Sequence, residues 1–183
     1  MSRRGSPPPA RLVVSVIYRE EERFRKALAA ISDRFGQVAE TSGIFPFDRT
    51  EYYAKEMGVP LYRRFVVMER LVPRDSLAWA KLAAEEMEAA FSDGGKRTVN
   101  VDPGLLTEEN YSLATGKNYS HRVYLRDGVF ADLTLIYERG GYRPLPWSYP
   151  DLASESIRSY LGEVRGRLRE ARKLAAEEPT CRG

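Results

Sequence analysis

Cysteine and histidine are nearly absent from this chain of 183 residues, which has one of each. The cysteine, Cys181, is third from the end, so a disulfide framework within the chain and a cysteine-rich zinc site are both excluded. A lone thiol in a terminal tail is typical of a reducing compartment. Such a tail rarely supplies the electropositive pocket that a catalytic cysteine needs.

Long apolar runs are also missing. The first apolar stretch, Leu12–Tyr18, has the length of a strand, and no segment approaches the length of a membrane-spanning helix. The basic, proline-rich start Ser2–Pro9 has no apolar region behind it, as a secretory or twin-arginine signal would require. We therefore expect a cytoplasmic protein that does not enter a membrane.

The charges nearly balance, with 29 Lys and Arg against 26 Asp and Glu. This small basic excess permits a polyanionic partner without requiring one. A hydrophobic content of 43% is sufficient for a packed core. The length predicts one domain over residues 11–175, between a disordered tail (1–10) and a flexible tail (176–183).

Apolar periodicity and turn residues predict the elements. The residue ranges 20–35 and 76–91 have helical stripes, and Gly36 and Gly58 are expected to end helices. The expected order is strand 12–18, helix 20–35, extended segment 37–47, short helix or ordered loop 48–58 capped by Asp48 or Thr50, strand 62–71, helix 76–91, strand 97–101 closed by a turn at Asp102–Gly104, hairpin 121–137, and a long helix capped by Asp151.

The fold class that follows is α+β. The first six elements have the β-α-β-β-α-β order of ferredoxin-like proteins, in which two helices cover one face of an antiparallel sheet. We expect the hairpin and the long helix to extend this core. The other sheet face would then be free for a ligand, a partner or the last helix.

The hairpin signal is Asp127-Gly128, typical of a type I′ turn. A two-residue loop would place His121 opposite Thr134, Val123 opposite Asp132, and Leu125 opposite Phe130. Opposed side chains share a face. His121, Asp132 and Thr134 would then lie on one face, and the other would be a core face with Val129, Ala131, Leu133 and Leu135.

Two interpretations of this polar face stay open. His121 is either a general acid or base whose tautomer Asp132 fixes, or part of a hydrogen-bonded cluster under the last helix. Asn100 and Asp102 either face one site from a strand, or Asp102 only bonds its own turn. The set Glu69, Asp102, His121 and Asp132 has oxygen and imidazole ligands, but no spacing that defines a metal site.

Ala114–Asn118 contains a Gly-Lys pair but is not a phosphate-binding P-loop. Tyr111 stands where the first glycine is required, and Asn118 where Ser or Thr is required. Lys117 and Arg122 can still bind a phosphate or carboxylate. The aromatic residues Tyr52, Tyr53, Trp147 and Tyr149 are candidates to stack on a planar ligand, although Trp147 in a proline-rich segment is also typical of a rigid corner.

Several motifs resemble one prokaryotic family, the domain of unknown function 4416 family. They are Tyr52–Gly58, Asn100–Gly104, Leu113–Leu125, Gly128–Tyr137 and Leu145–Asp151. The resemblance spans nearly the whole chain except the tails and implies no activity or cofactor. Where the family often has glutamate, this chain has Asp132. The polar positions that the resemblance marks are Tyr52, Tyr53, Glu56, Asn100, Asp102, Lys117, His121, Arg122, Thr134, Trp147, Tyr149 and Asp151.

The favoured hypothesis is a module that binds an anionic ligand (a nucleotide, a phosphorylated metabolite or RNA) on a polar sheet face. Its candidate residues are Tyr52, Tyr53, Asn100, Asp102, Lys117, Arg122, Thr134, Trp147 and Tyr149. The alternative is a small hydrolase or transferase in which His121 is the base, Asp132 orients it, and Asp102 with Asn100 holds water or a divalent metal. A third hypothesis is an assembly protein whose last helix pairs with a partner. The sequence leaves cofactors and oligomeric state open.

Overall fold

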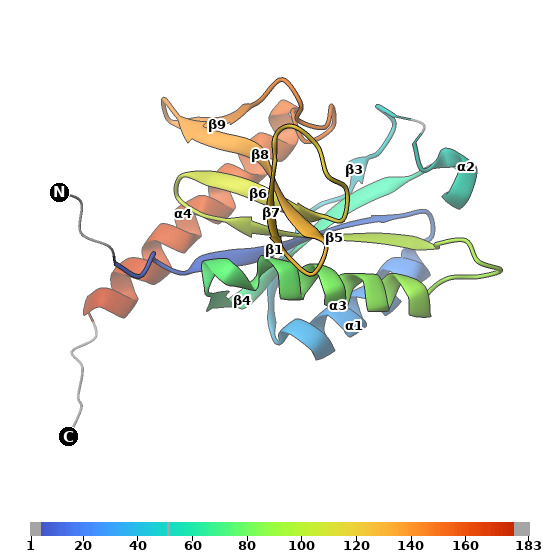
Figure 1. The fold of residues 1–183 in the computed structure, drawn as a ribbon, viewed down its shortest axis with the longest axis horizontal. Coiled ribbons are helices and arrows are strands. Elements are labelled where there is room, and N and C mark those ends of the chain that lie inside the picture. The colour runs from blue at the N-terminus through green and yellow to red at the C-terminus, as the bar shows by residue number, and fades with distance from the viewer. Residues whose placement is uncertain (1–4, 51, 178–183) are drawn as a thin grey trace.

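The computed structural model describes residues 5–50 and 52–177. This part of the chain is an α+β fold in which four α-helices pack on one nine-stranded antiparallel sheet (Figure 1). The elements are β1 (Ala10–Tyr18), α1 (Glu21–Phe35), β2 (Val38–Thr41), β3 (Phe45–Pro46), α2 (Ala54–Met57), β4 (Tyr62–Val72), α3 (Leu77–Ala90), β5 (Val99–Leu106), β6 (Asn110–Thr115), β7 (Arg122–Arg126), β8 (Val129–Glu138), β9 (Gly141–Pro144) and α4 (Glu155–Glu177).

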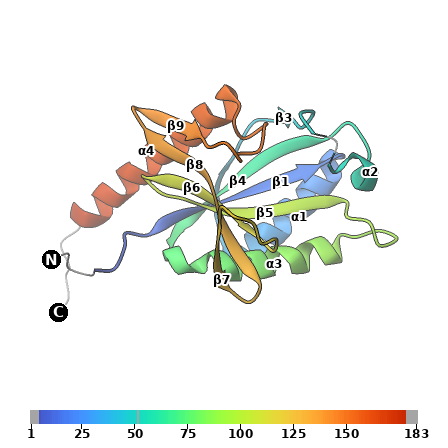
Figure 2. The ribbon, with the colours of Figure 1, turned by 45° about the horizontal axis from the view of Figure 1, so that its top comes forward.

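The central strand β1 is buried at every position because helices cover both faces of the sheet. Val14 and Val16 pack with α1 and α3, whereas Val13 packs in a second apolar cluster with α4. Figure 2 shows α4 on one side of the sheet and α1 with α3 on the other. Four apolar residues of α4, Ile157, Leu161, Val164 and Leu168, lie in the second cluster.

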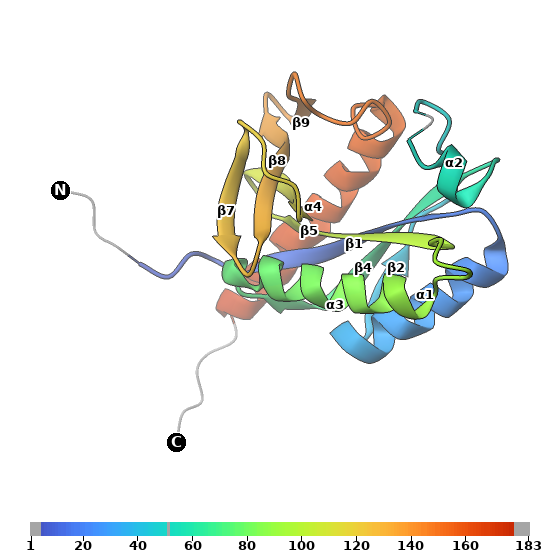
Figure 3. The same ribbon diagram turned by 45° about the vertical axis from the view of Figure 1, so that its right-hand side comes forward.

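The strand order is β2-β4-β1-β5-β6-β8-β7, with β3 paired to β4 and β9 to β8. The sheet divides between β5 and β6. Strand β1 pairs with β5 from Arg11 to Tyr18, but β6 pairs only with Gly104–Leu106. Figure 3 shows β7 and β8 running across the direction of β1 and β5. Over Val99–Pro103, β5 therefore has a strand partner on one side only.

The predicted turn at Asp102–Gly104 is wrong, because these residues continue β5. Backbone N–H groups alternate sides along a strand, and the N–H of Val101 points to the edge that lacks a strand. Pro103, two residues later, has its nitrogen on the same open side, so its missing N–H interrupts no ladder. No strand was predicted over β6.

The hairpin turn is present, with φ of 53° at Asp127 and 76° at Gly128, but the predicted register is wrong. Arg126 pairs with Val129, and an irregularity at Leu125 then shifts the ladder by one residue. Arg122, rather than Val123, therefore lies opposite Asp132. A second irregularity, in the pairing of β6 with β8, divides the predicted core face. Val129 and Ala131 pack with α1 and α3, whereas Leu135 packs with α4.

Two predicted caps are also wrong. Helix α4 begins at Glu155, and Asp151 is instead buried in an ion pair with Arg63. Helix α2 begins at Ala54 rather than after Asp48 or Thr50, and no side chain caps it. Gly36 and Gly58 do end α1 and α2, with φ of 98° and 78°.

Of the predicted tails, residues 1–4 and 178–183, with Cys181, lie outside the described residues. The regular elements overlap both predicted tail ranges slightly, since β1 begins at Ala10 and α4 ends at Glu177. No helix in the described part of the chain has both the length and the apolar character needed to cross a bilayer.

Candidate functional site

A cavity of about 410 Å³ lies at the open edge of β5, and we call it the edge cavity. Its walls come from α3, β5, the end of β6 and the segment before α2. The lining residues are Tyr52, Tyr53, Lys81, Glu85, Glu88, Arg97, Asn100, Asp102, Leu113, Ala114, Thr115, Gly116, Lys117, Asp132 and Tyr149. The cavity exists where it does because the sheet divides there and the space is not filled by a neighbouring strand.

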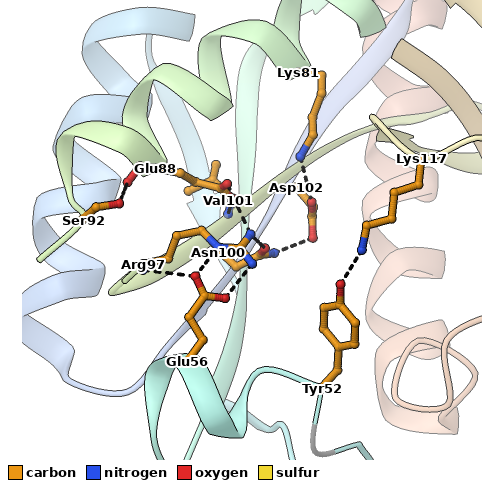
Figure 4. Close-up of polar contacts among 10 residues, drawn as sticks. All are labelled: Tyr52, Glu56, Lys81, Glu88, Ser92, Arg97, Asn100, Val101, Asp102 and Lys117. Atoms are coloured by element: carbon orange, nitrogen blue, oxygen red, sulfur yellow. Dashed lines mark hydrogen bonds and ion pairs between the residues drawn. The ribbon is translucent and has the colours of Figure 1, made fainter. Parts of the chain in front are cut away.

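Polar side chains of α3 take the place of the missing strand. Glu88 accepts a hydrogen bond from the backbone N–H of Val101 at 2.6 Å. Lys81 Nζ lies 3.2 Å from Asp102 Oδ1. The amide of Asn100 donates to Asp102 Oδ2 at 2.5 Å (Figure 4). Both oxygens of Asp102 are thus held, and the carboxylate has one fixed orientation at the cavity wall.

Arg97 links this network to α2. Its Nε and Nη2 donate to the two carboxylate oxygens of Glu56 at 2.8 and 2.7 Å, in the bidentate geometry that guanidinium and carboxylate groups prefer (Figure 4). Its Nη1 donates to Asn100 Oδ1 at 3.0 Å. The hydrogen bonds from Arg97 hold the pKa of Glu56 below its usual value, and those to Glu56 raise the pKa of Arg97. Both groups are therefore charged at neutral pH.

The buried groups of α3 have shifted pKa values. Burial alone would lower the pKa of Lys81, but the carboxylates of Asp102 and Glu88 outweigh it, and the pKa lies above its ordinary value. Burial raises the pKa of Glu88, and the nearby Lys81 opposes that shift. Lys81 is therefore a fixed cation rather than a nucleophile, because an amine must lose its proton to attack.

A second cavity of about 420 Å³ adjoins the first, and we call it the aromatic cavity. It shares Tyr52, Tyr53, Asp102, Leu113, Lys117 and Tyr149 with the edge cavity. Its other lining residues are Phe47, Arg49, Thr50, Arg63, Arg122 and Pro150. Burial raises the pKa of both Tyr53 and Tyr149, so their hydroxyls stay protonated and can donate hydrogen bonds.

Arg63 is the most buried cation of the aromatic cavity, with 4% of its side chain exposed. Its Nε lies 2.6 Å from Asp151 Oδ2, and its Nη1 donates to Ser15. The guanidinium also lies 5.2 Å from the ring centroid of Phe47. These contacts leave the guanidinium little freedom, so it is a preorganised positive charge in the cavity wall.

Lys117 and Arg122 lie at the mouth of the same cavity. Lys117 Nζ contacts the hydroxyl of Tyr52 and lies 4.7 Å from that ring's centroid. Arg122 donates to Asp132 Oδ2 at 2.8 Å and to the carbonyl of Lys117 at 2.9 Å. Arg122 thus fixes the backbone of Lys117, while the ammonium group of Lys117 has no carboxylate partner among the described residues.

His121 lines neither cavity. Its ring stacks on Trp147 at 4.8 Å between centroids with an interplanar angle of 11°, and Trp147 Nε1 donates to the carbonyl of Leu133 at 2.8 Å. His121 Nε2 lies 3.6 Å from Asp132 Oδ2, the oxygen that accepts from Arg122. The histidine therefore packs in an aromatic stack beside the site, with its nearest carboxylate bonded to another residue.

Of the predicted site residues, eight line one or both cavities: Tyr52, Tyr53, Asn100, Asp102, Lys117, Arg122, Asp132 and Tyr149. His121, Thr134 and Trp147 do not. Thr134 is fully buried, and its hydroxyl donates to the carbonyl of Asp132. The catalytic and ligand-binding roles themselves stay predictions.

Sequence reasoning missed Arg63 and four charged residues of the edge cavity: Lys81, Glu85, Glu88 and Arg97. A signal existed for α3, because positions 81, 85 and 88 have helical spacing. A solvated helix face has the same pattern, so the spacing alone was not decisive. Arg63 shares its strand face with the buried Phe65. The adjacent Arg64 points to the opposite face, so the two arginines give no pattern that shows which face is buried.

Among the described residues there is no group of three or more His, Cys, Asp or Glu side chains that could hold a metal ion. Glu69, a candidate metal ligand in the sequence, lines neither cavity. The charged and polar groups that line the two cavities are cations, carboxylates, amide and hydroxyl groups.

The fold and the site define a class: an α+β protein with two adjoining polar cavities where its antiparallel sheet divides. The family model described as Domain of unknown function (DUF4416) matches residues 8–168, and the chain belongs to this family. A search among curated proteins and a search among solved structures each found no match.

Proposed function

We propose that this protein binds a small anionic ligand, a nucleotide or a phosphorylated metabolite, in its two adjoining cavities. The observation that carries the proposal is the charge of the aromatic cavity. Its lining has four cationic side chains, Arg49, Arg63, Lys117 and Arg122, and a single carboxylate, Asp102. Arg63 and Arg122 are ion-paired with Asp151 and Asp132, so among the described residues the unpaired positive charge is that of Arg49 and Lys117. Charges of one sign in a cleft with low-dielectric walls concentrate the field and attract ligands of the opposite sign.

The cations of this cavity differ in how firmly they are held. Arg63 and Arg122 are oriented by Asp151 and Asp132, so they lose little conformational freedom when a ligand binds. Lys117, like Arg49, has no carboxylate partner within the described ranges and is available for a direct ion pair with the ligand. Tyr53 and Tyr149 add flat walls on which a planar group can stack.

A small molecule fits these observations better than RNA. Proteins that bind single-stranded RNA without sequence preference use a positive groove that follows the backbone. Here Arg63 is buried and Arg122 is partly buried, so the cations line a concave cavity instead. Cavities of 300–1,000 Å³ are typical of small-molecule sites, and both cavities lie in that range.

The test is calorimetric titration with inorganic phosphate and adenosine 5′-monophosphate, each at low and high salt. We expect binding that weakens as salt rises, and a loss of roughly tenfold in affinity, or about 1.4 kcal/mol, in Lys117→Met. The matched control is Lys26→Met. Lys26 lies on α1, across the sheet, and pairs with Glu22 at 2.7 Å. Absence of binding, or equal effects of the two substitutions, would contradict the proposal. Tight binding of an RNA oligonucleotide alone would replace it.

A second candidate function is a hydrolase or transferase for a phosphorylated or acyl substrate. One contact favours it: Asp132 lines the edge cavity, and His121 Nε2 lies 3.6 Å from it. His121 would be the base and Asp132 its orienting residue, with Asp102 and Asn100 holding water or a divalent metal. In that case His121→Asn abolishes the turnover of nitrophenyl phosphate or nitrophenyl acetate, while its circular dichroism spectrum stays that of the wild type. Turnover that persists in this variant, or that is absent from the wild type, excludes the role.

We also infer that β1, α1, β2, β4, α3 and β5 form a ferredoxin-like core. The order β2-β4-β1-β5, antiparallel at each pairing, supports this interpretation, as do α1 and α3 on one face. The remaining strands and α4 extend that core, and the ligand cavities lie at the junction of the two parts.

A further inference from the structure

We infer that the anionic ligand is a sugar phosphate, either free or as part of a nucleotide. This inference rests on the proposed function and adds to it the chemistry of the ligand's other end. The aromatic cavity supplies the excess of cations. The edge cavity, which shares one wall with it, has more carboxylates than cations in its lining. The carboxylates are Glu85, Glu88, Asp102 and Asp132, and the cations are Lys81, Arg97 and Lys117.

The two cavities are continuous enough for one ligand to contact both. Asp102 and Lys117 line both of them, and Tyr53 and Tyr149 form common walls. In Figure 4, Asp102 on β5 and Lys117 just after β6 face the same space, and Tyr52 reaches Lys117 from the segment before α2. A ligand whose phosphate lies near Lys117 therefore extends its remaining groups towards Asp102.

Asp102 can accept further hydrogen bonds. Each of its oxygens has one donor, Lys81 or Asn100, and a carboxylate offers about four lone-pair positions. With 23% of its side chain exposed, Asp102 is accessible from the cavity. Glu85, at the exposed end of the same cavity, has no donor among the residues that the structure describes. Hydroxyl groups of a ligand can donate to the lone pairs of these oxygens that have no donor.

Vicinal hydroxyls of a sugar are donors of this kind. A carboxylate that accepts from a ribose hydroxyl is a general way of recognising the sugar of a nucleotide. Inorganic phosphate would fill only the cationic end, and a dicarboxylate would place its second charge against Asp102. The tyrosine walls suit the apolar face of a sugar ring or a base, because aromatic side chains combine a large apolar surface with a polar end.

The experiment compares three probes by calorimetric titration of the full chain: inorganic phosphate, ribose 5-phosphate and adenosine 5′-monophosphate. We expect ribose 5-phosphate to bind about tenfold more tightly than phosphate, the effect of added hydrogen bonds to a charged group. Asp102→Asn and Glu85→Gln should each reduce that ratio while phosphate binding is retained. Lys117→Met should weaken all three probes. The last two variants change exposed or cavity-mouth groups, so they test the inference even if Asp102→Asn does not fold.

The outcomes separate the two proposals. Equal affinity for phosphate and ribose 5-phosphate would overturn the sugar-phosphate inference and leave the proposed anion binding intact. Failure of all three probes to bind would overturn both. If ribose 5-phosphate is preferred over phosphate, the third probe identifies the source. Tighter binding of adenosine 5′-monophosphate indicates a nucleotide, and weaker binding indicates a free sugar phosphate.

Discussion

The carboxylate of Glu88 lies 2.6 Å from the backbone nitrogen of Val101 and accepts its hydrogen bond, although the two residues belong to a helix and a strand edge. A strand edge in a protein interior has backbone donors that must be satisfied. Glu88 satisfies one of them with a side chain, which leaves room for a cavity where a further strand would otherwise pair.

Replacing Glu88 should therefore destabilise the fold. We expect Glu88→Ala to lower the free energy of unfolding by about 1–3 kcal/mol, the cost of an unsatisfied buried donor. Glu88→Gln should cost less, because its amide oxygen can accept the same hydrogen bond. Urea denaturation measures both, with Glu86→Ala, two residues away on the same helix and 72% exposed, as the control. Equal denaturation midpoints for Glu88→Ala and Glu86→Ala would show that the hydrogen bond between Glu88 and Val101 does not contribute to stability.

The pair Arg63 and Asp151 connects β4 to the segment before α4. Each side chain is 4% exposed, so removal of one partner leaves the other charge buried alone. We expect Arg63→Met and Asp151→Asn each to cost roughly 3–5 kcal/mol, and the double variant to cost less than the sum. Thermal or denaturant unfolding of all three variants completes the cycle. Additive losses would mean that the two groups are not energetically coupled.

The exposed pair of Arg126 and Asp127, 3.9 Å apart, provides the control for that cycle. Both side chains are more than half exposed, so Arg126→Met should change stability by less than about 1 kcal/mol.

Gly104 stands where the sheet divides, directly beneath the ring of Tyr111. A Cβ atom at this position would lie 2.6 Å from a ring carbon of Tyr111, closer than packed atoms approach. Since Tyr111 is fully buried, its ring cannot move away freely. We expect Gly104→Ala to destabilise the protein by about 1–3 kcal/mol, the typical cost of overpacking a core. The control is Gly116→Ala, where the nearest atom, Glu85 Oε1, lies 3.7 Å away. An unchanged free energy of unfolding in Gly104→Ala would mean that β5 and β6 can move apart at this point without cost.

The ion pair of Glu56 and Arg97 should make stability depend on pH. Its hydrogen bonds with Arg97 hold the pKa of Glu56 below the ordinary value of 4.5 in the folded state. A depressed carboxyl pKa stabilises the fold above the unfolded-state pKa, and this stabilisation is lost as the pH falls through the folded-state value. We expect melting temperatures of the wild type to fall more steeply below pH 4.5 than those of Glu56→Gln. Parallel curves for the two proteins would contradict this linkage.

Much of the fold follows from local patterns. The helical stripes of α1 and α3, the long last helix, the strand β1 and the glycines that end α1 and α2 depend on neighbours within a few residues, and they were predicted correctly. The Asp127-Gly128 turn also forms as expected, because its residues accept positive φ. The irregularity at Leu125 has no local signal, since it depends on how β7 and β8 fit the twisted sheet.

Local patterns were enough to predict the α+β class and eight of the residues that line the cavities, because side-chain periodicity and turn chemistry are short-range properties. Three features follow only from the folded arrangement: Asp102–Gly104 continues β5, Asp151 pairs with Arg63, and His121 packs on Trp147 outside both cavities. These outcomes depend on where the sheet divides and which side chains meet across it. Such contacts join residues far apart in the chain, and no local pattern encodes them.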